Sequence, residues 1–319
     1  MRLVEIAPPD YARDVLPLSA HLWAGRRDMD LYIAQTLEIA ASGYGKRHYK
    51  TFGLYDGPQL LASFKRYQRT IRWQQQGLRG VGIGAVFTPE HFRGRGYASA
   101  MLAMLLDRAR NDGDDFAYLF SDIRPHFYEE LGFTQLPSRA ISLRADTLAS
   151  KRIEVARLDD QDWSGVQRCF NLSERTRPWA MLRTPLVWDW IRLRTRHGSE
   201  HAAGVETNLV LRRGRSIAAY ALGVRALEHD AYIIDEFGTA DDEAAALLPA
   251  LLRAAAGDLR RVVGWLPPDG ARELLPRGSV RKRRDAIFMA APLSAAATKW
   301  LDAAASPSSA DGIWSTDHI

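Results

Sequence analysis

A glycine-rich turn between an expected strand and an expected helix constrains the fold of this chain most strongly. Val81, Ile83 and Phe87 belong to an alternating run that has the period of a β-strand. From Ala98 onward, apolar residues recur at the i, i+3, i+4, i+7 spacing of an amphipathic helix. Residues 93–96, Arg-Gly-Arg-Gly, join the two. This strand–turn–helix unit predicts an α/β (α+β) protein, with a mixed central sheet flanked by helices.

The same turn predicts a phosphate-binding site. Gly94 and Gly96 allow the backbone to approach a ligand closely, and successive N–H groups point outward at the N-terminus of the helix. The spacing is neither the G-x-G-x-x-G of a dinucleotide-binding loop nor the G-x-x-x-x-G-K-[ST] of a P-loop. A phosphate or pyrophosphate held in another kind of loop is therefore expected.

A second motif follows about thirty residues later. Tyr118–Asp122 predicts a short apolar strand that ends in the polar pair Ser121-Asp122. Pro125 and Gly132 then bracket a short expected helix, because proline favours a first helical turn and glycine a helix end.

Both motifs resemble those of one enzyme family. Arg93-x-x-Gly96-x-Ala98 is similar to the pyrophosphate loop of the GCN5-related N-acetyltransferases (GNAT), and Phe127-Tyr128-x-x-Leu-Gly-Phe is similar to their second CoA motif. The resemblance implies an acetyl-CoA co-substrate whose pantetheine arm lies where two strands splay apart. The residues implied to bind acetyl-CoA are Ala85, Val86, Phe87, Arg93, Gly94, Arg95, Gly96, Tyr97, Ala98, Ser121 and Asp122.

The resemblance also gives Tyr128 a role. The tyrosine at this place in the family donates a proton to the departing CoA thiolate, which a phenol within hydrogen-bond reach can do. The alternative is an aromatic residue that only packs a short helix. The flanking motif favours the general acid.

The chain is long enough for about two domains, and its second half repeats the order of expected elements in the first. We expect a catalytic GNAT domain over 1–148, a GNAT-like domain over 149–293 and a tail over 294–319. A strand near 140–144 is expected to close the first sheet, and a strand near 286–290 the second.

The second copy is expected to be degenerate. Where the first copy has its arginine–glycine loop, the second has Thr239-Ala240-Asp241-Asp242-Glu243. Acids cap a helix start well but repel a pyrophosphate. The tandem arrangement resembles the mycobacterial enhanced-intracellular-survival aminoglycoside acetyltransferases, without their sterol-carrier-like domain.

The C-terminal tail ends in Trp-Ser-Thr-Asp-His-Ile, which is unusually apolar for a chain end. In the family that the chain resembles, the terminal carboxylate enters the active site as general base. We therefore expect the carboxylate of Ile319 to take the proton of an incoming amine, with Asp317 and His318 as alternatives. A purely structural tail is the competing interpretation.

The sequence does not decide whether the acceptor is cationic or anionic. Trp23, Asp28, Asp30 and Tyr32 fall where the family places helices over the acceptor, and acids with aromatics suit a cationic amine. Arginines on the expected central strands would instead favour an anionic acceptor; these are Arg66, Arg69 and Arg72.

Composition excludes several other classes. There is no apolar run long enough to span a membrane and no signal-peptide core, so a cytoplasmic protein is expected. The basic residues behind the net charge of +5 are scattered along the chain apart from residues 281–284, which argues against nucleic acid as a partner.

Cys169 is expected to pack in a core. His197–His201 matches H-x-x-E-H, but it is expected in a loop, so no metal is expected.

The sequence therefore predicts an acyl-CoA-dependent N-acetyltransferase that transfers an acetyl group directly to the primary amine of a small molecule or peptide. Two alternatives are a non-catalytic acyl-CoA sensor and an aminoacyl-tRNA-dependent ligase of the Fem type, which is also built from two such folds. Whether the chain forms a homo-oligomer is left open.

Overall fold

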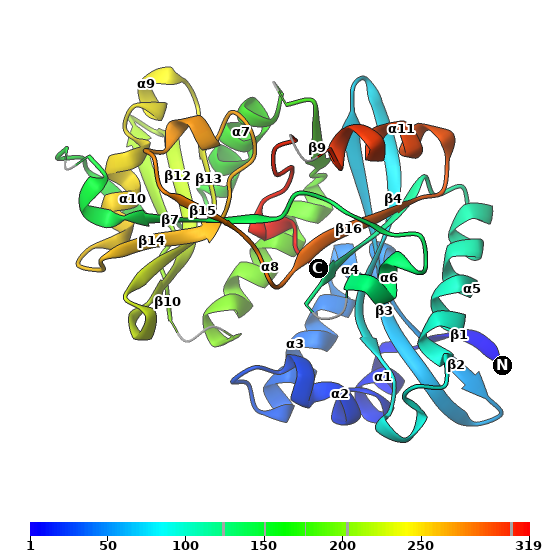
Figure 1. The fold of residues 1–319 in the computed structure, drawn as a ribbon. Helices are drawn as coiled ribbons and strands as arrows, with labels where there is room; N and C mark the ends of the chain where they lie inside the picture. Colours follow the sequence, from blue (N-terminus) through cyan, green and yellow to red (C-terminus); the bar gives the residue numbers. More distant parts are fainter. Residues whose placement is uncertain (123–124, 150, 176, 202–203, 307–308) are drawn as a thin grey trace.

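The computed structural model describes residues 1–319 except 123–124, 150, 176, 202–203 and 307–308. The side chains of 199–201 are also outside the described part. Within these residues the chain forms two mixed sheets of eight strands each, flanked by helices (Figure 1). The expected α/β class with two sheets is confirmed.

The first sheet, sheet A, contains the glycine-rich turn. Its strands follow the order β1-β2-β3-β4-β5-β16-β6, and β9 pairs with β3 beside them. The bounds are β1 Arg2–Ile6, β2 Tyr49–Asp56, β3 Gln59–Trp73, β4 Gln76–Phe87, β5 Phe116–Ser121, β6 Thr134–Gln135, β9 Trp179–Leu182 and β16 Ile287–Pro292.

Helices cover sheet A. Leucine and methionine side chains of α5, among them Met101, Leu102 and Leu105, are buried against Phe64 and Val81 of the sheet. Each such side chain contributes about 1.5–3 kcal/mol by leaving water. The helices near this sheet, α5 included, are α1 Pro8–Asp14, α2 Leu16–Trp23, α3 Met29–Ala41, α4 Gly43–His48, α5 Tyr97–Asn111, α6 Pro125–Glu129 and α11 Ala295–Ala304.

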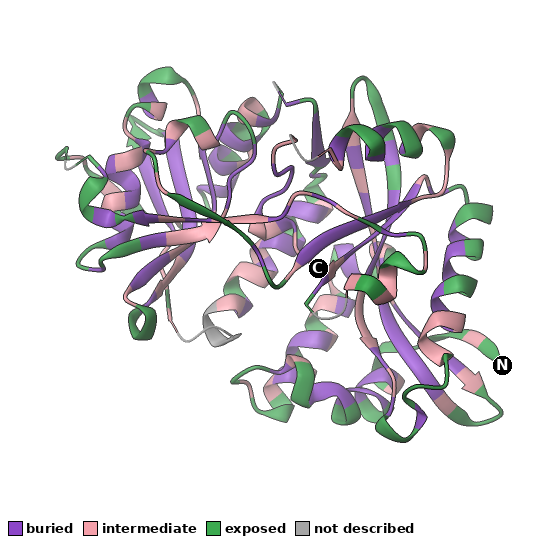
Figure 2. Ribbon diagram, viewed as in Figure 1, coloured by how far each residue is buried: buried purple, intermediate pink, exposed green. Residues whose placement is uncertain are grey.

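The second sheet, sheet B, has the order β15-β7-β14-β13-β12-β11-β8, with β10 paired to β12. Its strands are β7 Arg139–Arg144, β8 Val155–Arg157, β10 Val205–Glu206, β11 Leu209–Arg213, β12 Ser216–Ala226, β13 Ala231–Thr239, β14 Arg261–Trp265 and β15 Ser279–Lys282. Its helices are α7 Trp163–Glu174, α8 Pro185–His201, α9 Asp242–Ala245 and α10 Leu248–Ala256. In Figure 2 both sheets are largely buried, whereas the outer faces of the helices are exposed.

The two sheets exchange their closing strands, which corrects the sequence analysis. β7 pairs with β14 and β15 of sheet B, whereas β16 pairs with β5 of sheet A over its whole length. β16 is a short apolar run, and β7 is a short strand that buries Ile141 and Leu143; neither pattern specifies which sheet the strand joins. Sheet A is therefore completed by a segment that begins at Ile287, 105 residues after Leu182, the end of the preceding sheet A strand β9.

Two further features shape sheet A. Gln59–Trp73 form one long strand, β3, because the turn comes only at Gln74, which has a φ of +54°. Trp179 lies in β9, which comes from the second half of the chain and pairs with β3 of sheet A.

The internal repeat is visible in the strand pairing. In sheet A, Gly80–Ile83 of β4 lie parallel to Phe116–Leu119 of β5, and in sheet B, Ala231–Ile234 of β13 lie parallel to Arg261–Gly264 of β14. In sheet B the helix start that follows is capped by Asp241, whose carboxylate accepts the N–H of Ala244 at 2.9 Å. The second copy therefore presents an acid where the first presents glycines.

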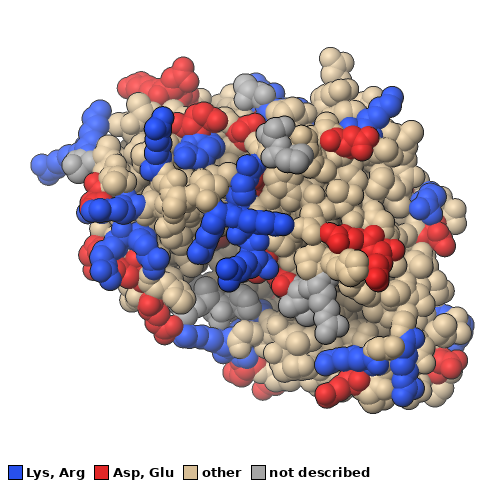
Figure 3. Space-filling view, viewed as in Figure 1, with Lys and Arg blue, Asp and Glu red and all other residues tan. Residues whose placement is uncertain are grey.

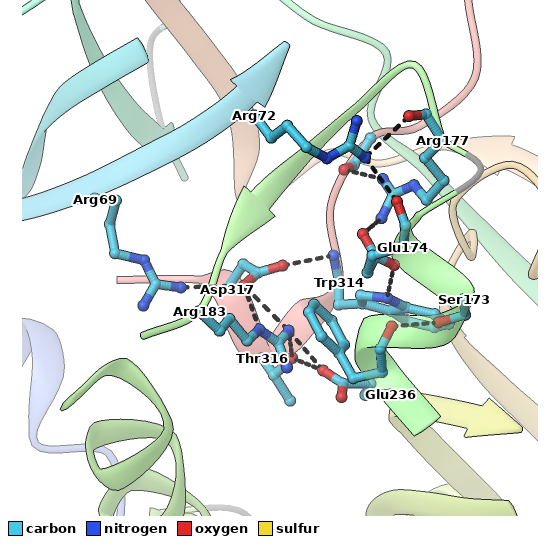
Figure 4. A network of polar contacts seen from close by, with 12 residues as sticks. Arg69, Arg72, Ser173, Glu174, Arg177, Arg183, Glu236, Trp314, Thr316 and Asp317 are labelled. Atoms are coloured by element: carbon cyan, nitrogen blue, oxygen red, sulfur yellow. Dashed lines mark hydrogen bonds and ion pairs between the residues drawn. The ribbon is translucent and has the colours of Figure 1, made fainter. Parts of the chain in front are cut away.

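The C-terminal tail ties the two sheets together through buried charges (Figure 4). One oxygen of Asp317 lies 3.0 Å from a nitrogen of Arg69, on β3, and 3.1 Å from one of Arg183, which follows β9. Arg183 also lies 2.7 Å from Glu236 of β13. All four side chains are at most 2% exposed, so each charge depends on its partners rather than on water.

Asp317→Asn is expected to destabilise the protein, because Arg69 would lose its acidic partner and Arg183 one of two. Breaking a buried pair from one side costs about 3–5 kcal/mol of unfolding free energy. Urea denaturation of the two proteins measures this difference.

Asp146→Asn is the matched control, because Asp146 pairs with Arg144 on the surface. It should unfold at the same urea concentration as wild type. Equal midpoints for wild type and Asp317→Asn would contradict the structural role given to this network.

Candidate active site

The expected pyrophosphate loop is formed between β4 and α5. Gly94 and Gly96 have φ values of +76° and +78°, the left-handed region that favours glycine. Residues 93–96 are exposed, and α5 starts at Tyr97 without a capping side chain. Its first N–H groups therefore point to a free surface, which suits a pyrophosphate. Ala98 lies in the first turn of the helix.

A slot opens beside this loop because β4 and β5 part. Their parallel pairing ends at Ile83 and Leu119. Beyond that point β4 continues only against β3, up to Phe87, and β5 only against β16, up to Ser121. The predicted splay is thus present. Ala85, Val86 and Phe87 lie on one side of it, with Ser121 and Asp122 on the other.

A β-bulge shapes the slot at Ala85, and sequence reasoning did not predict it. Ser63 pairs with Phe87 but Lys65 pairs with Gly84, so β4 has one residue more than β3 at this point. Ala85 adopts a φ of +48°, which is uncommon for a residue with a side chain. Bulges of this kind turn backbone groups away from the ladder and toward a ligand.

Tyr128 lies on α6, next to the end of β5. Its ring packs edge-on against Phe127 and Phe133, at centroid distances of 4.9 and 6.1 Å. Burial, and then the nearby carboxylate of Asp122, raise the pKa of Tyr128 to about 12. The phenol therefore keeps its proton at neutral pH, which a general acid requires.

A cavity of about 270 Å³ meets the slot at Ala85. Its walls come from the helices of the first half, the central strands β3 and β4, helix α8 and the tail. Among its described lining residues are six that sequence reasoning selected: Trp23, Tyr32, Ala85, Asp122, His318 and Ile319. Helix α8 belongs to the second half of the chain, so both halves build this cavity.

The charges expected to select an acceptor do not line the cavity. Asp28 caps α3 by accepting the N–H of Leu31 at 2.8 Å, and Asp30 is exposed in the first turn of that helix. Three arginines have structural partners instead: Arg66 pairs with Asp114, Arg69 pairs with Asp317, and Arg72 donates to the carbonyls of Glu174 and Arg177. Charges that do line the cavity are Arg27, Lys65, Arg194 and Asp122.

The end of the tail lies at the junction of slot and cavity. A Cβ atom at Gly82 of β4 would come within 2.7 Å of the Ile319 side chain. The ring centroids of His318 and Phe120 lie 4.7 Å apart. The backbone carbonyl of His318 accepts a hydrogen bond from the Arg194 guanidinium. Asp317 does not reach the cavity wall because it is held between Arg69 and Arg183.

The H-x-x-E-H segment was expected in a loop, but α8 continues through His201. His197 is buried and its Nε2 lies 2.8 Å from a Glu38 oxygen. The side chains of 199–201 lie outside the described part of the chain, and within that part no group of three His, Cys, Asp or Glu is arranged to hold a metal. Cys169 is buried, as expected, and burial raises the pKa of its thiol to about 11.

Basic side chains gather on the face shown in Figure 3, near where β15 leads toward β16. Arg281, Lys282 and Arg284 of this connection are exposed. Such a surface provides a favourable long-range field for an anionic co-substrate. Among the described residues, no helix is long and apolar enough to cross a membrane.

Comparison with known proteins indicates an acetyltransferase domain in the first half of the chain. Residues 30–136 match a family model described as an acetyltransferase (GNAT) domain. A curated lysine acetyltransferase from Yarrowia lipolytica is 31% identical over 112 residues, which span 33% of this chain and 29% of that protein.

Solved structures extend the likeness to nearly the whole chain. A probable N-acyltransferase from Enterococcus faecalis has a TM-score of 0.72 at 14% identity, covering 92% of this chain and 72% of the other. Eis1 from Mycobacterium abscessus has a TM-score of 0.60 at 12% identity, covering 92% and 73%. Residues 30–136 are therefore similar to a GNAT acetyltransferase domain, and the chain shares its two-sheet fold with these structures.

Proposed function

We propose that this protein is an acyl-CoA-dependent N-acyltransferase that moves an acetyl group from acetyl-CoA to a primary amine. One observation carries the proposal: the slot between β4 and β5 opens at Ala85 into the cavity that also receives the end of the tail. A donor in the slot and an acceptor in the cavity would meet at this point. Direct attack in a ternary complex follows from that arrangement.

The donor would be held mainly by backbone. The N–H groups of residues 93–98 would bind the pyrophosphate at the start of α5. Backbone groups of Ala85, Val86 and Phe87 would align the pantetheine, and the bulge at Ala85 would aim a donor at the thioester carbonyl. Ser121 and Asp122 would form the opposite wall.

Two groups would move protons. The Ile319 carboxylate, at the cavity wall, would take the proton that an ammonium must lose before it attacks. Tyr128 would then give its proton to the leaving thiolate. Asp317 would act as a positioning residue, because its two arginine partners hold the tail in place. The catalytic half would comprise the expected domain 1–148 without β7, completed by β9 and β16, and sheet B with its helices would support it.

Isothermal titration of acetyl-CoA tests the donor site. Wild type should bind in the micromolar range, and the double variant Arg93→Ala, Gly96→Asp should not, because an acid in the loop repels the pyrophosphate. Arg213→Ala is the control, since Arg213 pairs with Asp241 at the equivalent turn of the second copy. Absence of binding by wild type would overturn the proposal and favour the tRNA-dependent ligase.

Tyr128→Phe should lower kcat by about 100-fold and leave KM nearly unchanged, since it removes a proton donor but keeps the ring. Steady-state release of free thiol measures both constants. Tyr118→Phe on β5 is the matched control, because the Tyr118 hydroxyl is buried without a hydrogen-bond partner in the described structure. Equal kcat values for the two variants would remove Tyr128 from the mechanism.

Deletion of Ile319 should lower kcat by about 100-fold while acetyl-CoA affinity stays within about threefold, because the terminal carboxylate would be withdrawn from the acceptor. Ile319→Ala keeps a carboxylate at the same position and should retain most of the activity. A deletion variant that turns over like Ile319→Ala would show that the carboxylate is not the base.

A further inference from the structure

One cation of the acceptor cavity has no acidic partner. Lys65 of β3 lines the cavity and is only 9% exposed. Within the described part of the chain, its ammonium makes neither an ion pair nor a hydrogen bond. Its neighbours are the rings of Tyr11, Tyr32 and Tyr49, with centroids 5.8, 5.8 and 5.9 Å away.

Among the described residues, three of the other four buried lysines and arginines have an acidic partner, whereas the fourth, Arg283, lies over the Trp265 ring outside the cavity. Arg69 pairs with Asp317, Arg183 with Glu236 and Arg177 with Glu174. Ring faces attract an ammonium, but they accept none of its three N–H groups as a carboxylate would. Burial, helped by the charge of Arg27, lowers the pKa of Lys65 to about 8, so the ammonium form still predominates at neutral pH. A buried, unpaired ammonium in a ligand cavity indicates that the ligand brings the counter-charge.

The surrounding charges agree with an anionic ligand group. Two further arginines, Arg27 and Arg194, line the same cavity. The acids at its wall are Asp122, which accepts the N–H of Ala286 at 3.0 Å, and the terminal carboxylate, which is proposed as the base. Because the three cations Arg27, Lys65 and Arg194 outnumber these two acids at neutral pH, a polycationic acceptor would be repelled.

The position of Lys65 fixes where that anion would lie. Lys65 pairs across the sheet with Gly84, the residue just before the bulge at Ala85. An acceptor whose anion contacts Lys65 would therefore keep its amine close to the thioester. A cavity of about 270 Å³ suits a small molecule that carries both groups, such as an amino acid.

We propose that the acceptor is an amine that also carries a carboxylate, and that the Lys65 ammonium binds this carboxylate. This inference rests on the proposed acetyltransferase function. Lys65 is then a specificity-determining residue: it selects amino acids over plain amines and amides through one charge-assisted contact.

The test compares the standard amino acids with their C-terminal amides as acceptors, using acetyl-CoA and release of free thiol. Wild type should acetylate at least one free amino acid about 100-fold more efficiently than its amide, because the amide leaves Lys65 unpaired. Lys65→Met, which keeps the length of the side chain, should lose that preference, chiefly through a raised KM. Lys65→Arg should retain part of it.

Two controls separate this proposal from the function on which it rests. Lys50→Met, on the neighbouring strand β2, removes a lysine that pairs with Glu5 outside the cavity, and it should keep the wild-type preference. Acetyl-CoA titration of Lys65→Met should match wild type, which shows that the variant is folded with an intact donor site.

The proposal is overturned if wild type acetylates the amides as efficiently as the free amino acids. The same holds if Lys65→Met lowers kcat/KM equally for amino acids and amides. It is also overturned if wild type binds acetyl-CoA but acetylates none of the amino acids, in which case the donor site stands. Failure of wild type to bind acetyl-CoA would instead overturn the proposed acetyltransferase function itself.

Discussion

The site depends on the buried ion network in which Asp317 bridges Arg69 and Arg183, and Arg183 reaches Glu236. Where water is excluded, each of these charges requires its partner, so the tail has one stable position between the two sheets. That position brings Ile319 against β4, beside the slot. The last residue of the chain therefore reaches the proposed active site, although it is distant in sequence from the strands and helices that form the rest of that site.

Exchange of the closing strands has a similar effect on the acceptor cavity. With β16 in sheet A and β7 in sheet B, neither half has a complete sheet alone. The cavity lies where both halves meet, and α8 of the second half supplies Trp190 and Arg194 to its wall. The second copy lacks the glycine loop, yet it still shapes the cavity in which we propose that the acceptor binds.

Much of the donor side could be predicted from the sequence. Gly94, Gly96 and the strand–helix units around them act through backbone conformation, which is local. The acceptor side could not be predicted in this way. Asp28 is a helix cap and Arg69 a structural partner of the tail, whereas Lys65, which the sequence analysis did not select, is the buried cation of the cavity. No local pattern distinguishes a strand lysine that faces solvent from one that faces a cavity.

Local sequence patterns are enough to predict the α/β class, the repeat, the glycine-rich loop and the short helix of Tyr128, because periodicity, glycine and proline act within a few residues of themselves. Which sheet each closing strand joins, where the tail ends and which charges face the cavity depend on the tertiary structure. These features depend on contacts between residues far apart in the chain, such as Arg69 with Asp317 and Phe116 with Pro292. Their energies come from burial and pairing, which exist only once the two halves have packed together.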